Sequence, residues 1–276
     1  MAASPEPPDA LRDLNAELDG ESRADDLARR LFAQDASIYE QRPAGVVFPA
    51  CSEDVRRIVE FAGSLDLSLI PRGGGTSLAG QCVGEGLVVD FSRMDRLIEV
   101  DEERGRARVQ PGIVLDELNR QLVSTGWMFA PDTSTASRCQ IGGMIGNNSC
   151  GSHSVYYGTT RDHLLEAEVV LADGSVVELA EWSAEEVDRR AERDDRLGCA
   201  LAQLKREVDE HRELIRERYP RPELLRRNTG YPLDLFVAED SPDSFPLQEF
   251  AFTSNRSRTR SVRRFTPSTT TRRRSN

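Results

Sequence analysis

The run PRGGGTSLAGQ, residues 71–81, follows the apolar segment LSLI, residues 67–70, and contains four glycines. Glycine has no Cβ, so the backbone can turn sharply there and approach a ligand closely. Consecutive amide N–H groups in such a loop can point together at phosphate oxygens. The stretch therefore predicts a strand that ends in a ligand-binding loop.

A second run of small residues, IGGMIGNNSCG, occupies positions 141–151. One glycine-rich run alone would favour a merely flexible loop. Here each run lies near predicted strands, and each contains Thr, Ser or Asn side chains that can form hydrogen bonds. Two such loops from distant parts of one chain indicate a large cofactor held from both sides, which we interpret as FAD.

The pattern around these runs predicts an α+β fold. Apolar strands at 46–48 and 67–70 flank a helix from Ser52 to Ala62, which makes a β-α-β unit whose last strand delivers the first loop. Further predicted elements are a helical segment at 11–35 with a break near Gly20, a strand at 87–90, hairpins at 98–109 and 167–179, a helix at 114–123, a long loop at 129–161 and a charged helical region at 184–218.

The residues present and their spacing argue against several common nucleotide-binding and metal-binding motifs. A Walker loop needs Gly-Lys-Ser/Thr, but the only lysine is Lys205. The Rossmann fingerprint fails because Leu78 stands where its third glycine would lie. The five cysteines form no C-x-x-C pair, so the sequence predicts no metal site.

The charge of the chain and the spacing of its cysteines indicate which partners it binds and in which cellular compartment it occurs. The formal net charge is −11, which divides into +7 for residues 246–276 and −18 for the rest. The acidic body repels nucleic acid, so we expect no specific nucleic-acid partner. Widely spaced cysteines and the lack of an apolar span favour a cytoplasmic protein without a transmembrane segment, with peripheral attachment to the inner face of a membrane as the alternative.

The segment 246–276 is rich in Arg, Ser and Thr and has no periodicity, so we expect it to be disordered. Its abrupt change of sign is consistent with a shifted or artificially ended reading frame. Weak attraction to nucleic acid through the arginines is the alternative; in that case, removing the segment would abolish the association.

In the order and identity of these motifs, the chain resembles the FAD-binding domain of the p-cresol methylhydroxylase and vanillyl-alcohol oxidase type. The resemblance covers roughly residues 25–240 and rests on the two glycine runs together with FP at 48–49, PD at 131–132, YGTTRD at 157–162 and ADG at 172–174. Within that superfamily it is most similar to FAD-linked D-lactate dehydrogenases and the glycolate oxidase flavoprotein subunit. DASIY at 35–39 points to the large members that carry an iron–sulfur domain.

The resemblance implies a set of FAD-binding positions in two loops and the segments beside them. The first group would bind the diphosphate, the second would border the isoalloxazine ring, the third would form a loop against the flavin, and the fourth would place backbone near the adenine. These positions are Arg72, Gly73, Gly74, Gly75, Thr76, Ser77, Gly80 and Gln81; Pro131, Asp132 and Thr135; Ile141, Gly142, Gly143, Asn147, Asn148, Gly151, Ser152 and Gly158; and Val169 and Val170.

Covalent members of the superfamily carry a histidine in the first loop that is linked to the flavin. Thr76 takes that place here, which predicts noncovalent FAD. His153 is the only histidine near the expected site, and a surface position fits it slightly better than a chemical role. We expect His163 to be structural and Cys139 and Cys150 to fill space.

The resemblance also implies four regions: a disordered and helical lead-in at 1–42, a two-subdomain FAD-binding domain at 43–223, the start of a truncated substrate or cap domain at 224–245, and the tail at 246–276. It implies a FAD-dependent oxidoreductase that oxidises a small D-2-hydroxy acid (D-lactate, glycolate or D-2-hydroxyglutarate type) by hydride transfer, with an iron–sulfur domain or protein as electron-transfer partner. No catalytic base can be nominated, because the family places it mostly in the cap. A catalytically inactive FAD-binding fragment remains the alternative.

Overall fold

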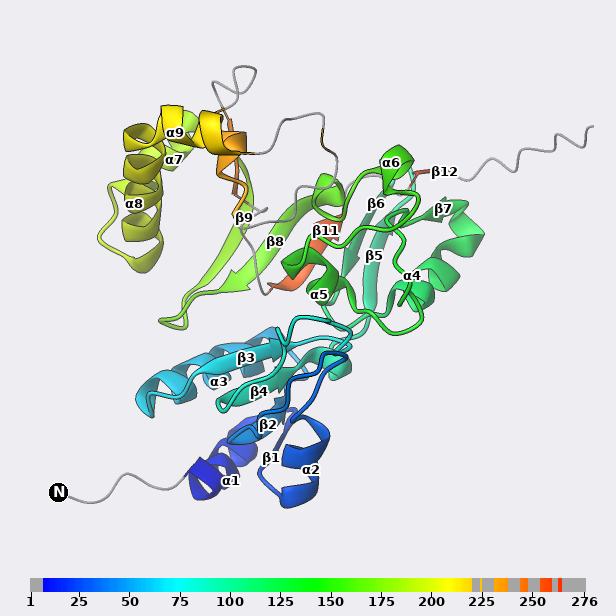
Figure 1. Ribbon diagram of the computed structural model, residues 1–276, viewed down its shortest axis with the longest axis vertical. Coiled ribbons are helices and arrows are strands. Elements are labelled where there is room, and N and C mark those ends of the chain that lie inside the picture. The colour runs from blue at the N-terminus through cyan, green and yellow to red at the C-terminus, as the bar shows by residue number, and fades with distance from the viewer. Residues whose placement is uncertain are drawn as a thin grey trace, which may run out of the picture.

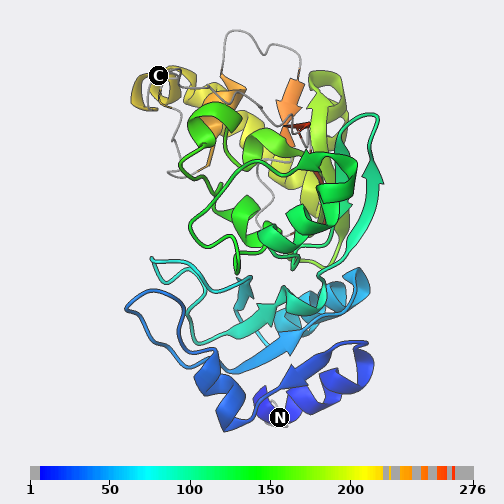
Figure 2. The ribbon, with the colours of Figure 1, turned by 90° about the vertical axis from the view of Figure 1, so that its right-hand side faces the viewer.

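The computed structural model describes residues 7–219, 224, 231–237, 244–247, 254–259 and 263–264. Two sheet-containing units lie one above the other, and both views show the N-terminal unit stacked against the second unit (Figures 1 and 2). No helix in these residues is both long enough and apolar enough to cross a membrane.

The first unit is a four-stranded sheet in the order β1-β2-β4-β3. Strands β2 and β3 are parallel to β4, whereas β1 is antiparallel to β2. The predicted β-α-β unit is confirmed, with α3 as the crossover between β2 and β3. The elements are α1 (Pro7–Glu17), β1 (Glu21–Arg23), α2 (Asp26–Leu31), β2 (Gly45–Phe48), α3 (Ser52–Ser64), β3 (Leu69–Arg72), β4 (Leu87–Asp90) and η1 (Phe91–Arg93).

Helices cover both faces of this sheet. Alternate residues of each strand point to opposite sides, so each strand packs against helices on both sides. Val47 and Leu87 pack with side chains of α1 and α3. Val46 and Val88 pack with Ala28 of α2 on the other side. This two-sided burial explains the continuous apolar strands in the sequence.

The lead-in differs from the expected helical segment at 11–35, because β1 separates α1 from α2. The chain passes so close to β2 at Gly20 that a Cβ there would lie 2.0 Å from the Phe48 carbonyl oxygen. Gly20 thus lets Glu21–Arg23 pair with β2, which a helix could not do.

The second unit is a six-stranded sheet in the order β10-β9-β8-β11-β6-β5. The predicted hairpins are confirmed as β5–β6 and β8–β9. The elements are β5 (Leu97–Asp101), β6 (Arg106–Val109), α4 (Leu115–Leu122), η2 (Val123–Thr125), β7 (Trp127–Met128), α5 (Ile141–Gly146), α6 (Ser154–Tyr157), η3 (Arg161–His163), β8 (Leu164–Val170) and β9 (Val176–Ser183), followed by β10 (Ser244–Pro246) and β11 (Ser254–Thr259).

The predicted loop at 129–161 is partly helical, since it contains α5 and α6. Ile141 and Met144 of α5 are buried with α4 in one apolar cluster. Burial of this face compensates for three glycines in a six-residue helix, a composition with poor intrinsic helix propensity.

The charged region at 184–218 is helical as predicted, and it forms three helices: α7 (Ala184–Ala191), α8 (Arg196–Glu210) and α9 (Arg212–Arg218). They share an apolar cluster with Trp182 of β9 and Phe236 of η4 (Leu233–Phe236). Most of the expected first turn of a cap domain, residues 226–231, lies outside the described residues.

Within the segment 246–276 the structure describes residues 246–247, strand β11 and strand β12 (Arg263–Arg264), which pairs with β7. The sequence did not predict these two strands, because no alternation of apolar and polar residues marks them. The rest of the expected disordered tail lies outside the described residues.

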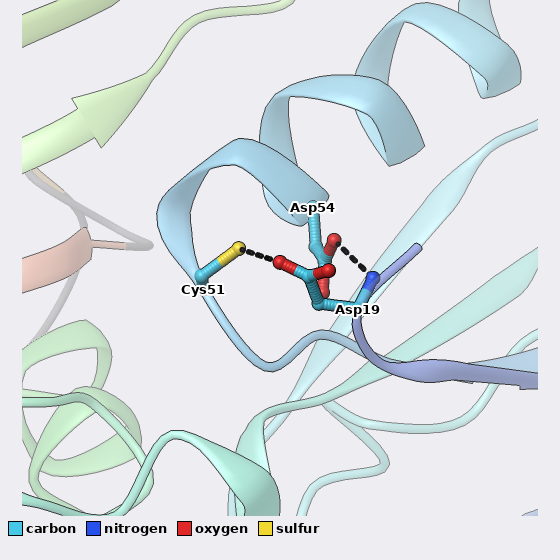
Figure 3. A group of neighbouring side chains, drawn as sticks. All are labelled: Asp19, Cys51 and Asp54. Carbon is cyan, nitrogen blue, oxygen red and sulfur yellow. Dashed lines mark hydrogen bonds between the residues drawn. The ribbon is translucent and has the colours of Figure 1, made fainter. Parts of the chain in front are cut away.

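A buried carboxylate joins the lead-in to the start of α3. Asp54 is 1% exposed and accepts backbone N–H bonds from Asp19 and Gly20 at 3.0 Å and from Ala50 at 2.8 Å. Figure 3 shows it beside Asp19 and Cys51, whose thiol donates to Asp19 at 3.7 Å. Because three N–H groups occupy the Asp54 carboxylate, this cluster is a structural junction.

We expect Asp54→Ala to lower the free energy of unfolding by roughly 2–4 kcal/mol, because three backbone N–H groups lose a buried, charged acceptor. Chemical denaturation measures this change. Asp19→Ala is the control: Asp19 is exposed, so its loss should cost under about 0.5 kcal/mol. Equal losses for both variants would show that the junction does not depend on Asp54.

Candidate functional site

The first glycine loop leaves the carboxyl end of β3 and bends back on itself. Gly75 and Gly80 have φ values of +61° and +71°, which side-chain-bearing residues rarely adopt. The Arg72 side chain folds over the bend, since a Cβ on Gly75 would lie 2.5 Å from Nη2 of Arg72. The loop therefore presents backbone and one guanidinium on its inner side.

The second glycine run packs directly on the first. A Cβ on Gly74 would lie 2.2 Å from the carbonyl oxygen of Arg138, and a Cβ on Gly73 would lie 3.7 Å from Cα of Gly143. The Gln81 amide also donates to Oδ1 of Asn147 at 2.7 Å. The two runs are thus neighbours in space, as the sequence predicted.

The two loops line one cavity of about 270 Å³. A Cβ on Gly143 would meet no atom within 4 Å, whereas a Cβ on Gly142 would lie 2.7 Å from Cβ of Pro111. Gly142 therefore permits close packing and Gly143 leaves open space. The lining residues are Pro71, Arg72, Gly73, Gln81, Cys82, Phe91, Pro111, Gly142, Gly143, Gly146 and Asn147.

A second cavity of about 220 Å³ adjoins the first, because Pro71 and Phe91 line both. Its other walls are apolar side chains of α3, β3 and β4 together with Val170 and Leu171 at the β8–β9 turn. The two cavities together extend from the second glycine run to that hairpin.

Arg72 carries the unused donor of the site. Its Nη1 is buried and has no hydrogen-bond partner among the described residues. Its guanidinium lies 5.1 Å from the centre of the Phe32 ring, and that ring cannot accept a planar N–H bond in the way a phosphate can. A buried N–H without an acceptor costs stability, so an anionic ligand fits this position.

The pKa values of two carboxylates near Arg72 are shifted in opposite directions. Burial raises the pKa of Asp90. Burial also acts to raise the pKa of Asp35, but hydrogen bonds from Ser37 and Cys82 and the charge of Arg72 outweigh it, so that pKa is lowered. Asp35 also belongs to the segment that supports the first loop, where Ala36 N–H donates to the Gly75 carbonyl at 3.0 Å.

Asp132 ties two further predicted segments together. Its carboxylate lies 2.8 Å from Nδ1 of His153 and accepts the Ser152 hydroxyl at 3.2 Å. A Cβ on Gly151 would lie 1.8 Å from the Asp132 carbonyl oxygen. The side chain of His153 is 70% exposed, as a surface loop position predicts.

Most of the other predicted positions shape the loops and line neither cavity. Asn148 has a φ of +44° and its side chain accepts Arg161 N–H at 3.0 Å. Ile141 and Val169 are buried in apolar clusters, while Val170 lines the second cavity. Predicted residues that line neither cavity are Gly74, Gly75, Thr76, Ser77, Gly80, Pro131, Asp132, Thr135, Ile141, Asn148, Gly151, Ser152, Gly158 and Val169.

Sequence reasoning missed several lining residues, namely Pro71, Cys82, Phe91, Pro111 and Gly146. Pro71 is the first residue of the first glycine run and Cys82 directly follows that run, so their positions in the sequence could have indicated them. Phe91 and Pro111 follow strands β4 and β6, and only the three-dimensional arrangement brings them to the cavity.

Two side chains that were expected to be structural lie in the interior. His163 is 2% exposed, and its Nε2 lies 2.8 Å from the Tyr157 carbonyl oxygen. Cys139 is buried, its Sγ lies 3.2 Å from the Thr133 hydroxyl, and burial raises the pKa of its thiol. A thiol that stays protonated is a poor nucleophile, which agrees with a packing role for Cys139.

A family model described as FAD binding domain matches residues 43–180, half of the chain. The chain is 38% identical over 248 residues to D-2-hydroxyglutarate dehydrogenase of Pseudomonas putida, covering 88% of this chain and 24% of that protein. It is 37% identical over 152 residues to glycolate oxidase subunit GlcD of Bacillus subtilis, covering 54% of this chain and 32% of that protein. The chain thus spans about a quarter to a third of the length of these relatives.

Solved structures agree on the fold. Alkyldihydroxyacetonephosphate synthase has a TM-score of 0.59 at 25% identity, over 65% of this chain and 36% of that chain. p-Cresol methylhydroxylase has a TM-score of 0.54 at 18% identity, over 62% of this chain and 35% of that chain. The predicted α+β fold of the p-cresol methylhydroxylase type is confirmed.

We expect the Asp132 contacts to stabilise the protein fully above about pH 4 and progressively less as the pH falls further. Burial opposes ionisation, but the hydrogen bonds from His153 and Ser152 outweigh it and lower the pKa of Asp132. A lowered pKa gives stability above the unfolded-state value of about 4, which is lost as the pH falls through the folded-state value. Thermal midpoints of the wild type and Asp132→Asn should therefore differ at pH 7 and converge toward pH 3. An unchanged gap at pH 3 would contradict this account.

Proposed function

This chain belongs to the FAD binding domain family, and on that premise we propose that it is the flavin-binding part of a FAD-dependent oxidoreductase that oxidises a D-2-hydroxy acid. The observation that carries the proposal is the pair of glycine loops lining one cavity beside the unpaired N–H of Arg72. A protein whose body is strongly acidic needs such local donors to hold an anionic cofactor.

The chain's residues suit the parts of FAD in turn. Arg72 and the amides of the first loop would hold the diphosphate, while the second loop would pass against it with Gly143 leaving room. The apolar cavity beside Val170 would take the adenine. Pro131 and Asp132 would border the flavin ring, held in place by the contacts from Ser152 and His153.

FAD, when bound, accepts the hydride that leaves the carbon bearing the hydroxyl group. The chain contributes positioning: its rigid loops fix the cofactor, and its apolar walls keep water from one end. Thr76 cannot form the histidyl link of covalent flavoproteins, so we infer that the FAD is dissociable.

The substrate class rests on the relatives. D-2-hydroxyglutarate dehydrogenase and glycolate oxidase subunit GlcD bear names of enzymes that act on small 2-hydroxy acids. D-Lactate dehydrogenase (cytochrome) 1 of Saccharomyces cerevisiae, 33% identical over 143 residues, points to the same class. An iron–sulfur electron-transfer partner or domain is part of this proposal. A FAD-binding fragment without activity is the second candidate, because this chain spans only part of its relatives' length.

Purified protein is expected to show the visible absorbance of flavin and to release all of it on acid precipitation. Retention of flavin in the pellet would contradict dissociable binding. Anaerobic addition of D-2-hydroxyglutarate, D-lactate or glycolate should then bleach the bound flavin, with L-lactate as the control. Bound flavin that none of the three acids reduces would favour the inactive fragment. Failure to bind any FAD would overturn the proposed function.

Arg72→Met is expected to weaken FAD binding by about tenfold to a hundredfold, since a charge-assisted hydrogen bond to the diphosphate is lost. Titration of the apoprotein, followed by flavin fluorescence, measures the dissociation constant. Arg138→Met is the matched control: it removes the same charge beside the same loops from an exposed side chain. A small effect that salt abolishes is expected there. Equal losses in both variants would argue against a direct contact from Arg72.

A further inference from the structure

Gln140 lies beside this site and has a buried side-chain oxygen that no described residue uses. It directly precedes α5, is 7% exposed, and its Oε1 is buried with no hydrogen-bond partner among the described residues. Its backbone, by contrast, is fixed: the carbonyl accepts Met144 N–H at 2.9 Å, and the residue forms a bridge with Val114. The backbone of Gln140 is therefore fixed, while no described residue forms a hydrogen bond with its Oε1.

This atom lies at the contact between the two glycine loops. Oε1 and Cβ of Gln140 each lie 3.4 Å from where a Cβ on Gly73 would stand. Gly73 and Gly143 both line the larger cavity. Gln140 itself lines neither cavity; its buried Oε1 packs against Gly73, a lining residue that has no side chain.

Another buried glutamine shows what a purely structural role looks like. Gln110 is 5% exposed, and its Oε1 accepts Arg96 N–H at 3.0 Å. An unpaired buried acceptor lowers stability, whereas a paired one does not. The two glutamines have nearly equal burial and differ in whether the protein itself satisfies Oε1.

Resting on the function proposed above, we infer that Oε1 of Gln140 accepts a hydrogen bond from a hydroxyl of the ribityl chain of FAD. The diphosphate has only acceptor oxygens, so it suits the unpaired donor of Arg72 and not the acceptor of Gln140. Hydroxyl donors flank the diphosphate on both sides, in the ribityl chain and in the adenosine ribose. The adenosine half would occupy the apolar cavity beside Val170, which leaves the ribityl half for the larger cavity, and Gln140 adjoins that cavity through its contact with Gly73.

The test compares Gln140→Met with Gln110→Met in the full chain, using FAD, FMN and ADP as ligands. Gln140→Met should weaken FAD and FMN binding by about fivefold to tenfold and leave ADP binding unchanged, because ADP lacks the ribityl chain. The melting temperature of the Gln140→Met apoprotein should stay equal or rise, since an unpaired buried acceptor is removed. Gln110→Met should lower the melting temperature of the apoprotein and leave the flavin dissociation constant unchanged.

A second measurement changes the ligand as well as the protein. An FMN analogue whose ribityl chain lacks hydroxyls should bind about fivefold to tenfold more weakly than FMN, and Gln140→Met should add no further loss for that analogue.

Three results would overturn the inference: FAD affinity unchanged in Gln140→Met, ADP affinity lost in place of FMN affinity, or a lowered apoprotein melting temperature that alone accounts for weaker binding. A wild type that binds neither FAD nor FMN would instead refute the proposed function, so the two failures are distinguishable.

Discussion

The site depends on backbone-to-backbone contact between two loops that have no side chains at the point of contact. A Cβ on Gly74 would stand 2.2 Å from the Arg138 carbonyl oxygen, and one on Gly73 would stand 3.7 Å from Cα of Gly143. Because the Arg138 neighbour is backbone, a larger residue at position 74 would push the loops apart. The cavity lies along this contact, and its walls exist because the two units can approach so closely.

Each loop is anchored in its own apolar core, which keeps their relative position fixed. The first leaves β3, whose neighbour β4 is buried throughout. The second begins with Ile141, which is 0% exposed, and is closed by the hydrogen bond from Arg161 N–H to Asn148. Binding residues on rigid supports lose little conformational freedom when a ligand arrives.

Much of this arrangement could be predicted from the sequence where one physical signal dominated. The β-α-β unit and both hairpins were predicted because apolar runs and turn residues agree there, as in Ala172-Asp173-Gly174. The composition of the two glycine runs and the family resemblance together predicted that the runs lie side by side. Helix α5 was missed because three glycines argue against a helix, and only burial against α4 supports one. Strand β1 was missed because three residues pair only through contact with a distant strand.

The lining of the cavity was harder to predict, because it is made by residues with no motif of their own. Phe91 follows β4 and Pro111 follows β6, so each reaches the cavity through tertiary packing. Gln140 carries no signal in the sequence either. Its unpaired oxygen becomes visible only when the hydrogen bonds of the described residues are known.

The electrostatics of Arg72 show how an acidic chain can keep a cationic group available. Asp35 and Asp90 lie near it, yet their carboxylates are committed to the backbone: Asp35 accepts Ser37 N–H at 2.8 Å, and Asp90 accepts Ser92 N–H at 2.9 Å. Burial also raises the pKa of Asp90, which disfavours its charged form. The nearby acids are therefore poorly placed to satisfy Nη1 of Arg72. A local donor of this kind can attract a phosphate even where the summed charge of the protein repels it, because screening limits the reach of exposed distant charges.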